Sequence, residues 1–308
     1  MSNVKNLGHL ESRQDWIDYR NDVMKMSVQE KLRGIPHIRY INLDERPKRD
    51  ELIKEQFNKY GITDYKRLSA SKYSAQELKA NWYEYVCCPS RHNLRYTSIL
   101  INQLHSIIDW YDEEISETCL ILEDDLSFDN VENWTYDWSV LMDYIPKNWE
   151  CVQLHILGLT YMRMNMHQRT NNNQGATCYM INRKYAKKLI DLHWCVRPED
   201  GNRLRFLNNA GYGRCYEFPE FYTQSPDFVP YEIGPTYSIP LFTTNKKLKY
   251  LSDAHHTHIN KHAMIADKVV TEWWKNKAPK YEYNDILTVD SQKSKEMIFK
   301  IGNGQESW

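Results

Sequence analysis

The chain has 308 residues, of which 41% are hydrophobic and 26% are charged. A chain of this length and composition can bury a core without disulfides or metals, which excludes a collagen-like, coiled-coil or largely disordered protein. Its 40 basic and 41 acidic residues leave a formal net charge of −1, so it lacks the overall positive field of a protein that binds nucleic acid non-specifically.

Residues 1 to 34 are polar and compatible with helices, and we expect them to pack on the core as an N-terminal helical extension. No apolar run near the start has the length of a signal peptide, and none elsewhere approaches the roughly 18 residues of a membrane helix. The seven cysteines are scattered without a C-x-x-C pair, which favours reduced thiols over a zinc site. These features predict a soluble, cytoplasmic protein with no membrane span.

A strand, a helix and a second strand are predicted at the start of the main domain. The run from 37 to 43 is short and rich in strand-forming residues, and Pro47 suits the first turn of a following helix. Gly61 is placed to end that helix. Residues 65 to 68 form the second strand candidate. This order is typical of the repeating unit of a parallel sheet.

The following elements alternate between helices and short apolar strands. Residues 92 to 111 have the clearest helical periodicity, and residues 184 to 192 predict a shorter helix. Strands are predicted at 119–122, 151–157 and 176–181. Residues 197 to about 245 are rich in Pro, Gly, Asn and aromatic side chains, which indicates long loops of the kind that carry acceptor sites. No repeat or linker divides the chain, so we expect a single domain.

Three consecutive carboxylates, Glu123, Asp124 and Asp125, directly follow the apolar run 119–122. Charges at the end of a buried strand are costly unless they bind something. Alternation along an extended chain predicts Glu123 and Asp125 on one side and Asp124 on the other. Ligands bind at such strand ends in α/β sheets, and divalent cations take oxygen ligands. The pattern favours a Mg²⁺ or Mn²⁺ site that holds a nucleotide diphosphate, with a solvated turn as the alternative.

A second polar group follows the first predicted strand. Asn42 and Asp44 could contact a nucleotide base and ribose, and Arg46, Lys48 and Arg49 follow at once. Basic side chains at this position could meet phosphate. A solvated, basic helix start is the alternative interpretation of the same residues.

Eight short segments occur in the order of a known family. They are Y-I-N-L-D-E-R-P-K-R at 40–49, G-I at 61–62, R-L-S-A at 67–70, S-R-H at 90–92, L-E-D-D at 122–125, W-E-C-V-Q-L at 149–154, G-A-T-C-Y-M-I at 175–181 and P-E-D at 198–200. Together they resemble glycosyltransferase family 25, which includes lipopolysaccharide glycosyltransferases and procollagen galactosyltransferases. The resemblance spans about residues 37 to 225, and the sequence after about residue 245 has no counterpart in it.

The resemblance implies a GT-A fold, a Rossmann-like mixed α/β sheet with a nucleotide-sugar site at the strand ends. The expected glycosyltransferase domain covers residues 35 to 262, followed by a C-terminal extension from 263 to 308. The implied reaction is an inverting, Mn²⁺- or Mg²⁺-assisted transfer of a hexose from a UDP-sugar to a hydroxyl of a glycan, protein or modified nucleic acid. Without a signal peptide, a bacterial or viral enzyme is more natural than a secretory collagen-modifying one.

The resemblance also implies roles for individual residues. Glu123 and Asp125 are then the metal ligands. The nucleotide contacts are Asn42, Leu43, Asp44, Arg46, Arg49, Ala70 and Asp124.

Two further groups complete the expected site. Inversion needs a general base on the acceptor hydroxyl, for which Asp200 is the candidate and Glu199 the reserve; an exposed loop acid is the alternative. One of His255, His256 and His258 is expected to complete the cation shell. A contact with phosphate or a solvated polar turn would also explain these histidines.

Two other functions compete with this one. The first is a catalytically silent GT-A domain that serves as a nucleotide-binding or structural subunit. The second is a nucleotidylyltransferase, but no G-x-G-x-x-G or G-x-x-x-x-G-K-[ST] phosphate loop occurs. The sequence does not distinguish the sugar or the acceptor.

Overall fold

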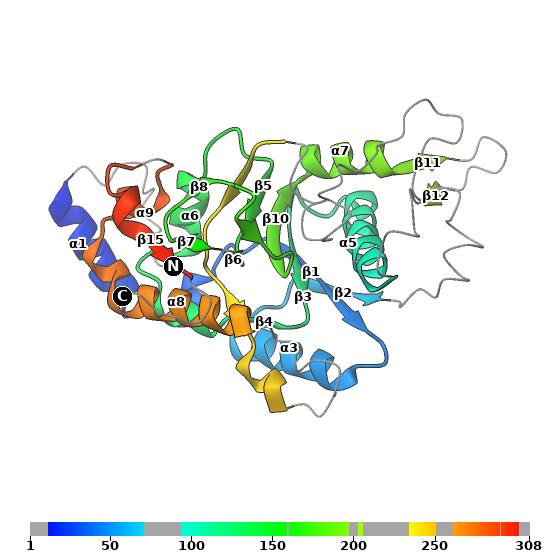
Figure 1. Ribbon diagram of the computed structural model, residues 1–308, viewed down its shortest axis with the longest axis horizontal. Helices are drawn as coiled ribbons and strands as arrows, with labels where there is room; N and C mark the ends of the chain where they lie inside the picture. The colour runs from blue at the N-terminus through cyan, green and yellow to red at the C-terminus, as the bar shows by residue number, and fades with distance from the viewer. Residues whose placement is uncertain are drawn as a thin grey trace.

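The computed structural model of the chain describes residues 12–70, 94–158, 160–196, 203–205, 234–250, 261–289 and 291–301. Its centre is a seven-stranded sheet in the order β2–β1–β3–β10–β5–β13–β8, with helices on both faces (Figure 1). These strands are β1 His37–Leu43, β2 Tyr65–Ala70, β3 Thr118–Glu123, β5 Cys151–Gln153, β8 His167–Gln168, β10 Cys178–Asn182 and β13 Thr236–Ser238.

The sheet is mixed, and five of its seven strands run in the same direction. Strand β1 is parallel to both β2 and β3. Strand β10 is antiparallel to β3 and to β5, β13 is parallel to β5, and β8 is antiparallel to β13. The predicted α/β class, with a mixed sheet between helices, is therefore confirmed.

Alternation along the strands builds a core on each face of the sheet. In β3, Cys119 and Ile121 face the core that holds α5 (Leu94–Glu113) and α7 (Arg183–His193), whereas Leu120 and Leu122 face the other core. Both faces of a largely parallel sheet must be covered, which explains why residues 119–122 of β3 are all apolar.

The second core is larger and includes side chains from helices on the other face of the sheet. Helices α3 (Pro47–Lys59), α6 (Trp138–Tyr144) and α8 (Lys261–Asn276) contribute to it. Trp16 of α1 (Arg13–Val23) also lies in this core with 1% of its surface exposed, so the N-terminal helix packs on the sheet domain as expected. None of the described helices is both long enough and apolar enough to cross a membrane.

Short helices, 3-10 turns and two-stranded pairs surround the central sheet. The short helices are α2 Val28–Lys31 and α9 Tyr283–Leu287, with 3-10 turns η2 Asp129–Asn133, η4 Lys246–Tyr250, η5 Ala278–Lys280 and η6 Ser294–Met297. The two-stranded pairs are β4 Leu126–Ser127 with β14 Thr243–Thr244, β6 Leu157–Gly158 with β9 Asn173–Gln174, β7 Tyr161–Arg163 with β15 Ile298–Lys300, and β11 Trp194–Val196 with β12 Arg203–Arg205.

Most predicted elements occur close to their expected positions. The first strand has the predicted bounds, Pro47 opens α3, and Gly61 has the left-handed φ of 66° that favours glycine after a helix. The strand predicted over 151–157 is shorter than expected. It ends at Gln153 because the next two N–H groups both donate to the carbonyl of Cys178, which interrupts regular pairing.

Candidate functional site

The sheet topology brings together the two polar groups that the sequence singled out. Strand β1 lies between β2 and β3, with Ile41 opposite Glu123 and Leu43 opposite Ala70. Because all three strands are parallel, their carboxyl ends meet at one edge of the sheet. Asn42 therefore lies beside the acidic residues that follow β3.

The acidic triplet does not follow the expected alternation. Asp124 and Asp125 form a turn between β3 and β4, and their carboxylates lie 2.8 and 3.2 Å from Nη2 of Arg49 on α3. Glu123 instead accepts a hydrogen bond from Gln103 Nε2 of α5, at 3.2 Å. The alternation is wrong at Asp125 because the strand ends at Glu123 and the turn redirects the chain toward α3.

Asp124 is the most buried member of the triplet, with 5% of its surface exposed. Its Oδ2 accepts a hydrogen bond of 2.7 Å from Asn42 Nδ2. Burial raises the pKa of Asp124 to about 6, although Arg49 acts in the opposite direction. Asp124 is thus held by a cation and an amide, and its charge is only partly compensated.

Asp125 has a carboxylate oxygen that its surroundings do not satisfy. Oδ2 faces Arg49, whereas Oδ1 is buried and has no hydrogen-bond partner in the described part of the chain. A buried carboxylate oxygen without a partner is costly, and a bound cation would supply the missing partner.

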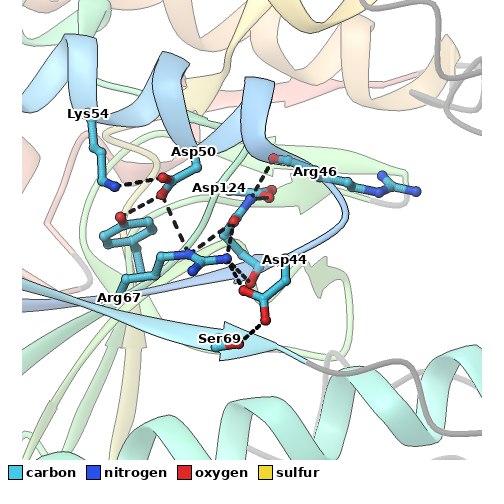
Figure 2. A network of polar contacts seen from close by, with 9 residues as sticks. Asp44, Arg46, Asp50, Lys54, Arg67, Ser69 and Asp124 are labelled. Atoms are coloured by element: carbon cyan, nitrogen blue, oxygen red, sulfur yellow. Dashed lines mark hydrogen bonds and ion pairs between the residues drawn. The ribbon is translucent and has the colours of Figure 1, made fainter.

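Arg67 of β2 organises the residues after β1, as Figure 2 shows. Its guanidinium donates to Asn42 Oδ1 at 2.8 Å from Nη2 and 3.1 Å from Nε, and Nη2 lies 2.5 Å from Asp44 Oδ1. Ser69 Oγ donates to the other oxygen of Asp44 at 2.5 Å. Hydrogen bonds from Ser69 and then Arg67 lower the pKa of Asp44. Asp44 is therefore an ionised, oriented and solvent-exposed carboxylate.

The same contacts fix the amide of Asn42. Its Oδ1 faces Arg67, so its Nδ2 donates both to Asp124 and to the carbonyl of Arg46, the latter at 3.2 Å. An Asn amide has two distinct ends, and only this orientation matches donors with acceptors. Asn42 consequently joins the residues after β1 to the acidic turn after β3.

The other predicted nucleotide contacts are placed differently. The Arg46 guanidinium points away from the Asp44 and Arg67 network in Figure 2. Leu43 and Ala70 pack against the core that holds α5. Leu43 and Ala70 therefore help to pack the ends of β1 and β2 against this core.

Residues from later in the chain also form hydrogen bonds with the acidic turn and with the strand β14 that follows it in space. The N–H of Asn245 donates to the carbonyl of Asp125 at 2.7 Å. Its neighbour Thr244 donates its N–H to Asp267 Oδ1 of α8 at 3.1 Å, and its hydroxyl bonds to the same carboxylate. The C-terminal part of the chain therefore takes part in shaping this edge of the sheet.

Five predicted site residues lie outside the described residues: Glu199, Asp200, His255, His256 and His258. Their predicted roles stay predictions. Asn245 precedes the histidine segment in the sequence and donates its N–H to Asp125 of the acidic turn. Asp267 follows the segment and accepts a hydrogen bond from Thr244 of β14.

The sequence did not single out Arg67, Ser69, Gln103 or Asn245 as residues of this site. Arg67 stands in the R-L-S-A segment at 67–70, and its place at a parallel strand end was the available signal. Gln103 lies in an amphipathic helix and Asn245 far along the chain, so neither position carried a signal. Their contacts depend on how distant elements pack.

Within the described residues, no group of three or more His, Cys, Asp and Glu side chains is placed to hold a metal ion. A cation at the acidic turn would take further oxygens from a bound diphosphate or from water. No protein-family model and no curated protein sequence matches the chain. A functional proposal therefore depends on the fold and on the contacts at this edge.

Proposed function

We propose that the chain is a metal-dependent, inverting glycosyltransferase of GT-A type that moves a hexose from a UDP-sugar to a hydroxyl of a glycan, protein or modified nucleic acid. The observation that carries this proposal is the unsatisfied negative charge after β3. Asp124 and Asp125 share the Arg49 guanidinium, and Asp125 Oδ1 is buried with no hydrogen-bond partner among the described residues. This charge lies at the sheet edge where α/β folds bind ligands.

The residues after β1 and β2 suit a nucleoside. Asp44 is ionised and exposed, and Arg67 and Ser69 hold its carboxylate in one orientation. An ionised carboxylate at a strand end can accept hydrogen bonds from the hydroxyls of a ribose. We therefore assign the ribose to Asp44, with Arg67 and Asn42 as the residues that position it.

The start of α3 suits the diphosphate. The helix begins at Pro47, directly beside the acidic turn, and its N-cap residue Arg46 makes no side-chain cap. The helix dipole favours anions at this end. Arg49, in the first turn, offers a planar guanidinium that suits phosphate as well as carboxylate.

A divalent cation fits the remaining oxygens. Asp125 would hold it through Oδ1, which has no hydrogen-bond partner among the described residues, and Glu123, whose carboxylate faces Gln103, is the proposed second ligand. When bound, a Mg²⁺ or Mn²⁺ ion neutralises charge on the diphosphate leaving group. The proposal keeps one of His255, His256 and His258 as a further ligand, and Asp200, with Glu199 in reserve, as the base that accepts the proton of the acceptor hydroxyl.

One observation favours the alternative of a catalytically silent GT-A domain. Arg49 already contacts both aspartates of the turn, as an internal cation would in a domain that binds no metal. A silent domain would bind UDP without turning over any sugar. Turnover, rather than binding alone, must therefore decide between the two functions.

The deciding experiment measures UDP or GDP release from a panel of nucleotide sugars, with Mn²⁺, with Mg²⁺ and with EDTA. The proposal predicts release from one UDP-sugar with a divalent cation, stimulated by a hydroxyl acceptor and abolished by EDTA. Binding of UDP with no turnover of any sugar under all conditions would favour the silent domain. Equal turnover in EDTA would overturn the metal assignment.

A further inference from the structure

We propose that Gln103 and Tyr179 act as a positioning pair that holds the carboxylate of Glu123 in one orientation for its ligand. The inference rests on the proposed function for the identity of that ligand, a divalent cation. The pair itself is inferred from the contacts of three side chains at the end of β3.

The three side chains form a continuous chain of hydrogen bonds. The Tyr179 hydroxyl donates to Gln103 Oε1 at 2.7 Å. Gln103 Nε2 then donates to Glu123 Oε1 at 3.2 Å and lies 3.5 Å from the carbonyl of Ala176. The chain crosses from β10, through α5, to the carboxyl end of β3.

The chemistry of the partners fixes the orientation of the Gln103 amide. The carboxylate of Glu123 and the carbonyl of Ala176 are both acceptors, so the NH₂ end of Gln103 must face them. The carbonyl end then requires a donor, and the Tyr179 hydroxyl is that donor. A flipped amide would put its oxygen against the carboxylate and against the carbonyl.

Burial makes this arrangement rigid. Gln103 has 2% of its surface exposed and Tyr179 has none, and Tyr179 lies within the apolar core that contains Trp110 and Ile181. Burial raises the pKa of Tyr179 well above its ordinary value, so its hydroxyl keeps its proton. A polar pair that points from an apolar core to a strand-end carboxylate is the arrangement of residues that orient metal ligands.

Two nearly isosteric variants separate positioning from packing. Tyr179→Phe removes only the hydroxyl, and Gln103→Met removes the amide while keeping a side chain of similar length. Because orienting partners typically change metal affinity about 10- to 100-fold, we expect each variant to weaken binding of Mn²⁺ alone by about tenfold or more. Binding is measured by electron paramagnetic resonance of free Mn²⁺.

Tyr136→Phe is the matched control. The Tyr136 hydroxyl is also fully buried but has no hydrogen-bond partner among the described residues, and the ring lies in the other core. Its loss should leave Mn²⁺ affinity unchanged. Equal affinity for Mn²⁺ in wild type, Tyr179→Phe and Gln103→Met would overturn the proposal, and so would equal losses in all three variants.

A metal-free measurement keeps the pair testable if the wild-type protein binds no cation. In that case the proposed metal fails, and hydrogen exchange of the ¹⁵N-labelled Gln103 side-chain amide decides the pair. Positioning predicts slow exchange in wild type and in Tyr136→Phe and faster exchange in Tyr179→Phe, because the hydroxyl that holds Gln103 Oε1 is then missing; equal exchange in all three proteins would also overturn the pair. Rapid exchange in wild type would overturn the pair.

Discussion

Two clusters of charged side chains lie near strand β1. They differ in how many of their carboxylate oxygens have a partner. In the Arg39 cluster (Arg39, Lys66 and Glu113), Arg39 and Lys66 each contact one oxygen of Glu113. In the acidic turn (Glu123, Asp124 and Asp125, with Arg49), Asp124 and Asp125 share the guanidinium of Arg49, and one oxygen of Asp125 has no hydrogen-bond partner within the described residues.

The pKa values of the two clusters move in opposite directions. Hydrogen bonds from Arg39, followed by Lys66, lower the pKa of Glu113 to about 2. Burial raises the pKa of Asp124 to about 6, despite Arg49. Both clusters contain a nearly fully buried charged group, so burial alone does not distinguish them. The difference is that Glu113 has a cation at each oxygen, whereas Asp124 and Asp125 share one guanidinium and Asp125 Oδ1 has no hydrogen-bond partner among the described residues.

The largest effect is expected for Arg49→Met, which removes the cation of the acidic turn. Losing one partner of a buried ion pair costs about 3–5 kcal/mol because the other charge stays buried. We expect the free energy of unfolding to fall by this amount in urea titrations without metal, and Mn²⁺ to restore part of it. Lys66→Met, which removes an exposed partner, should cost less than about 1 kcal/mol. Equal losses in the two variants would contradict the comparison.

The second largest effect is expected for Asp125→Asn. The substitution keeps the shape of the side chain but removes the charge that would meet the cation. Loss of a desolvated charge partner costs about 2–5 kcal/mol, so Mn²⁺-dependent binding of UDP should weaken by about a hundredfold or more in calorimetry. Glu113→Gln is the control from the Arg39 cluster and should bind UDP normally. Unchanged affinity in Asp125→Asn would remove Asp125 as a ligand.

A smaller effect is expected for Arg67→Lys. Arg67 contacts Asn42 and Asp44 at once through a planar guanidinium, and a lysine ammonium cannot reproduce this geometry. We expect UDP affinity to fall about tenfold, which corresponds to about 1.4 kcal/mol, with little change in Mn²⁺ affinity. A variant that binds UDP as wild type does would show that Asp44 needs no positioning.

The smallest effect is expected for Glu113→Gln and concerns pH. The pKa of Glu113 is about 2 in the folded chain against an ordinary value of 4.5. Its contribution to stability is therefore complete above about pH 4.5 and is lost as the pH falls toward 2. The side chain is 32% exposed, so the contribution should not exceed about 1 kcal/mol. Urea titrations at about pH 6 and about pH 3 should show a smaller difference for Glu113→Gln than for wild type.

Short-range sequence patterns predicted the first strand and the helix that follows it well. The first strand has its predicted bounds because its alternation, the following Pro47 and the glycine after the helix all act over short distances. The contact of Asn42 with Asp124 was not predicted, because it depends on β1 lying beside β3 in the sheet. The direction of Asp125 was predicted wrongly, because a two-residue turn overrides the alternation of a strand.

Side-chain partners from distant elements could not be predicted. Gln103 reaches Glu123 only because α5 packs across β3 and β10, and Asn245 reaches Asp125 only because β14 pairs with β4. The sequence around Gln103 and around Asn245 contains no motif or spacing that predicts these contacts. Such contacts depend on tertiary packing, which periodicity and turn signals do not encode.

The central claim is that the acidic turn binds a cation and a nucleotide together. Calorimetric titration of the chain with UDP- and GDP-sugars, with and without Mn²⁺, tests this claim most directly. We predict that one UDP-sugar binds only when Mn²⁺ is present, with one site per chain. If no nucleotide binds with or without the metal, the acidic turn is a structural feature and the proposed activity is wrong.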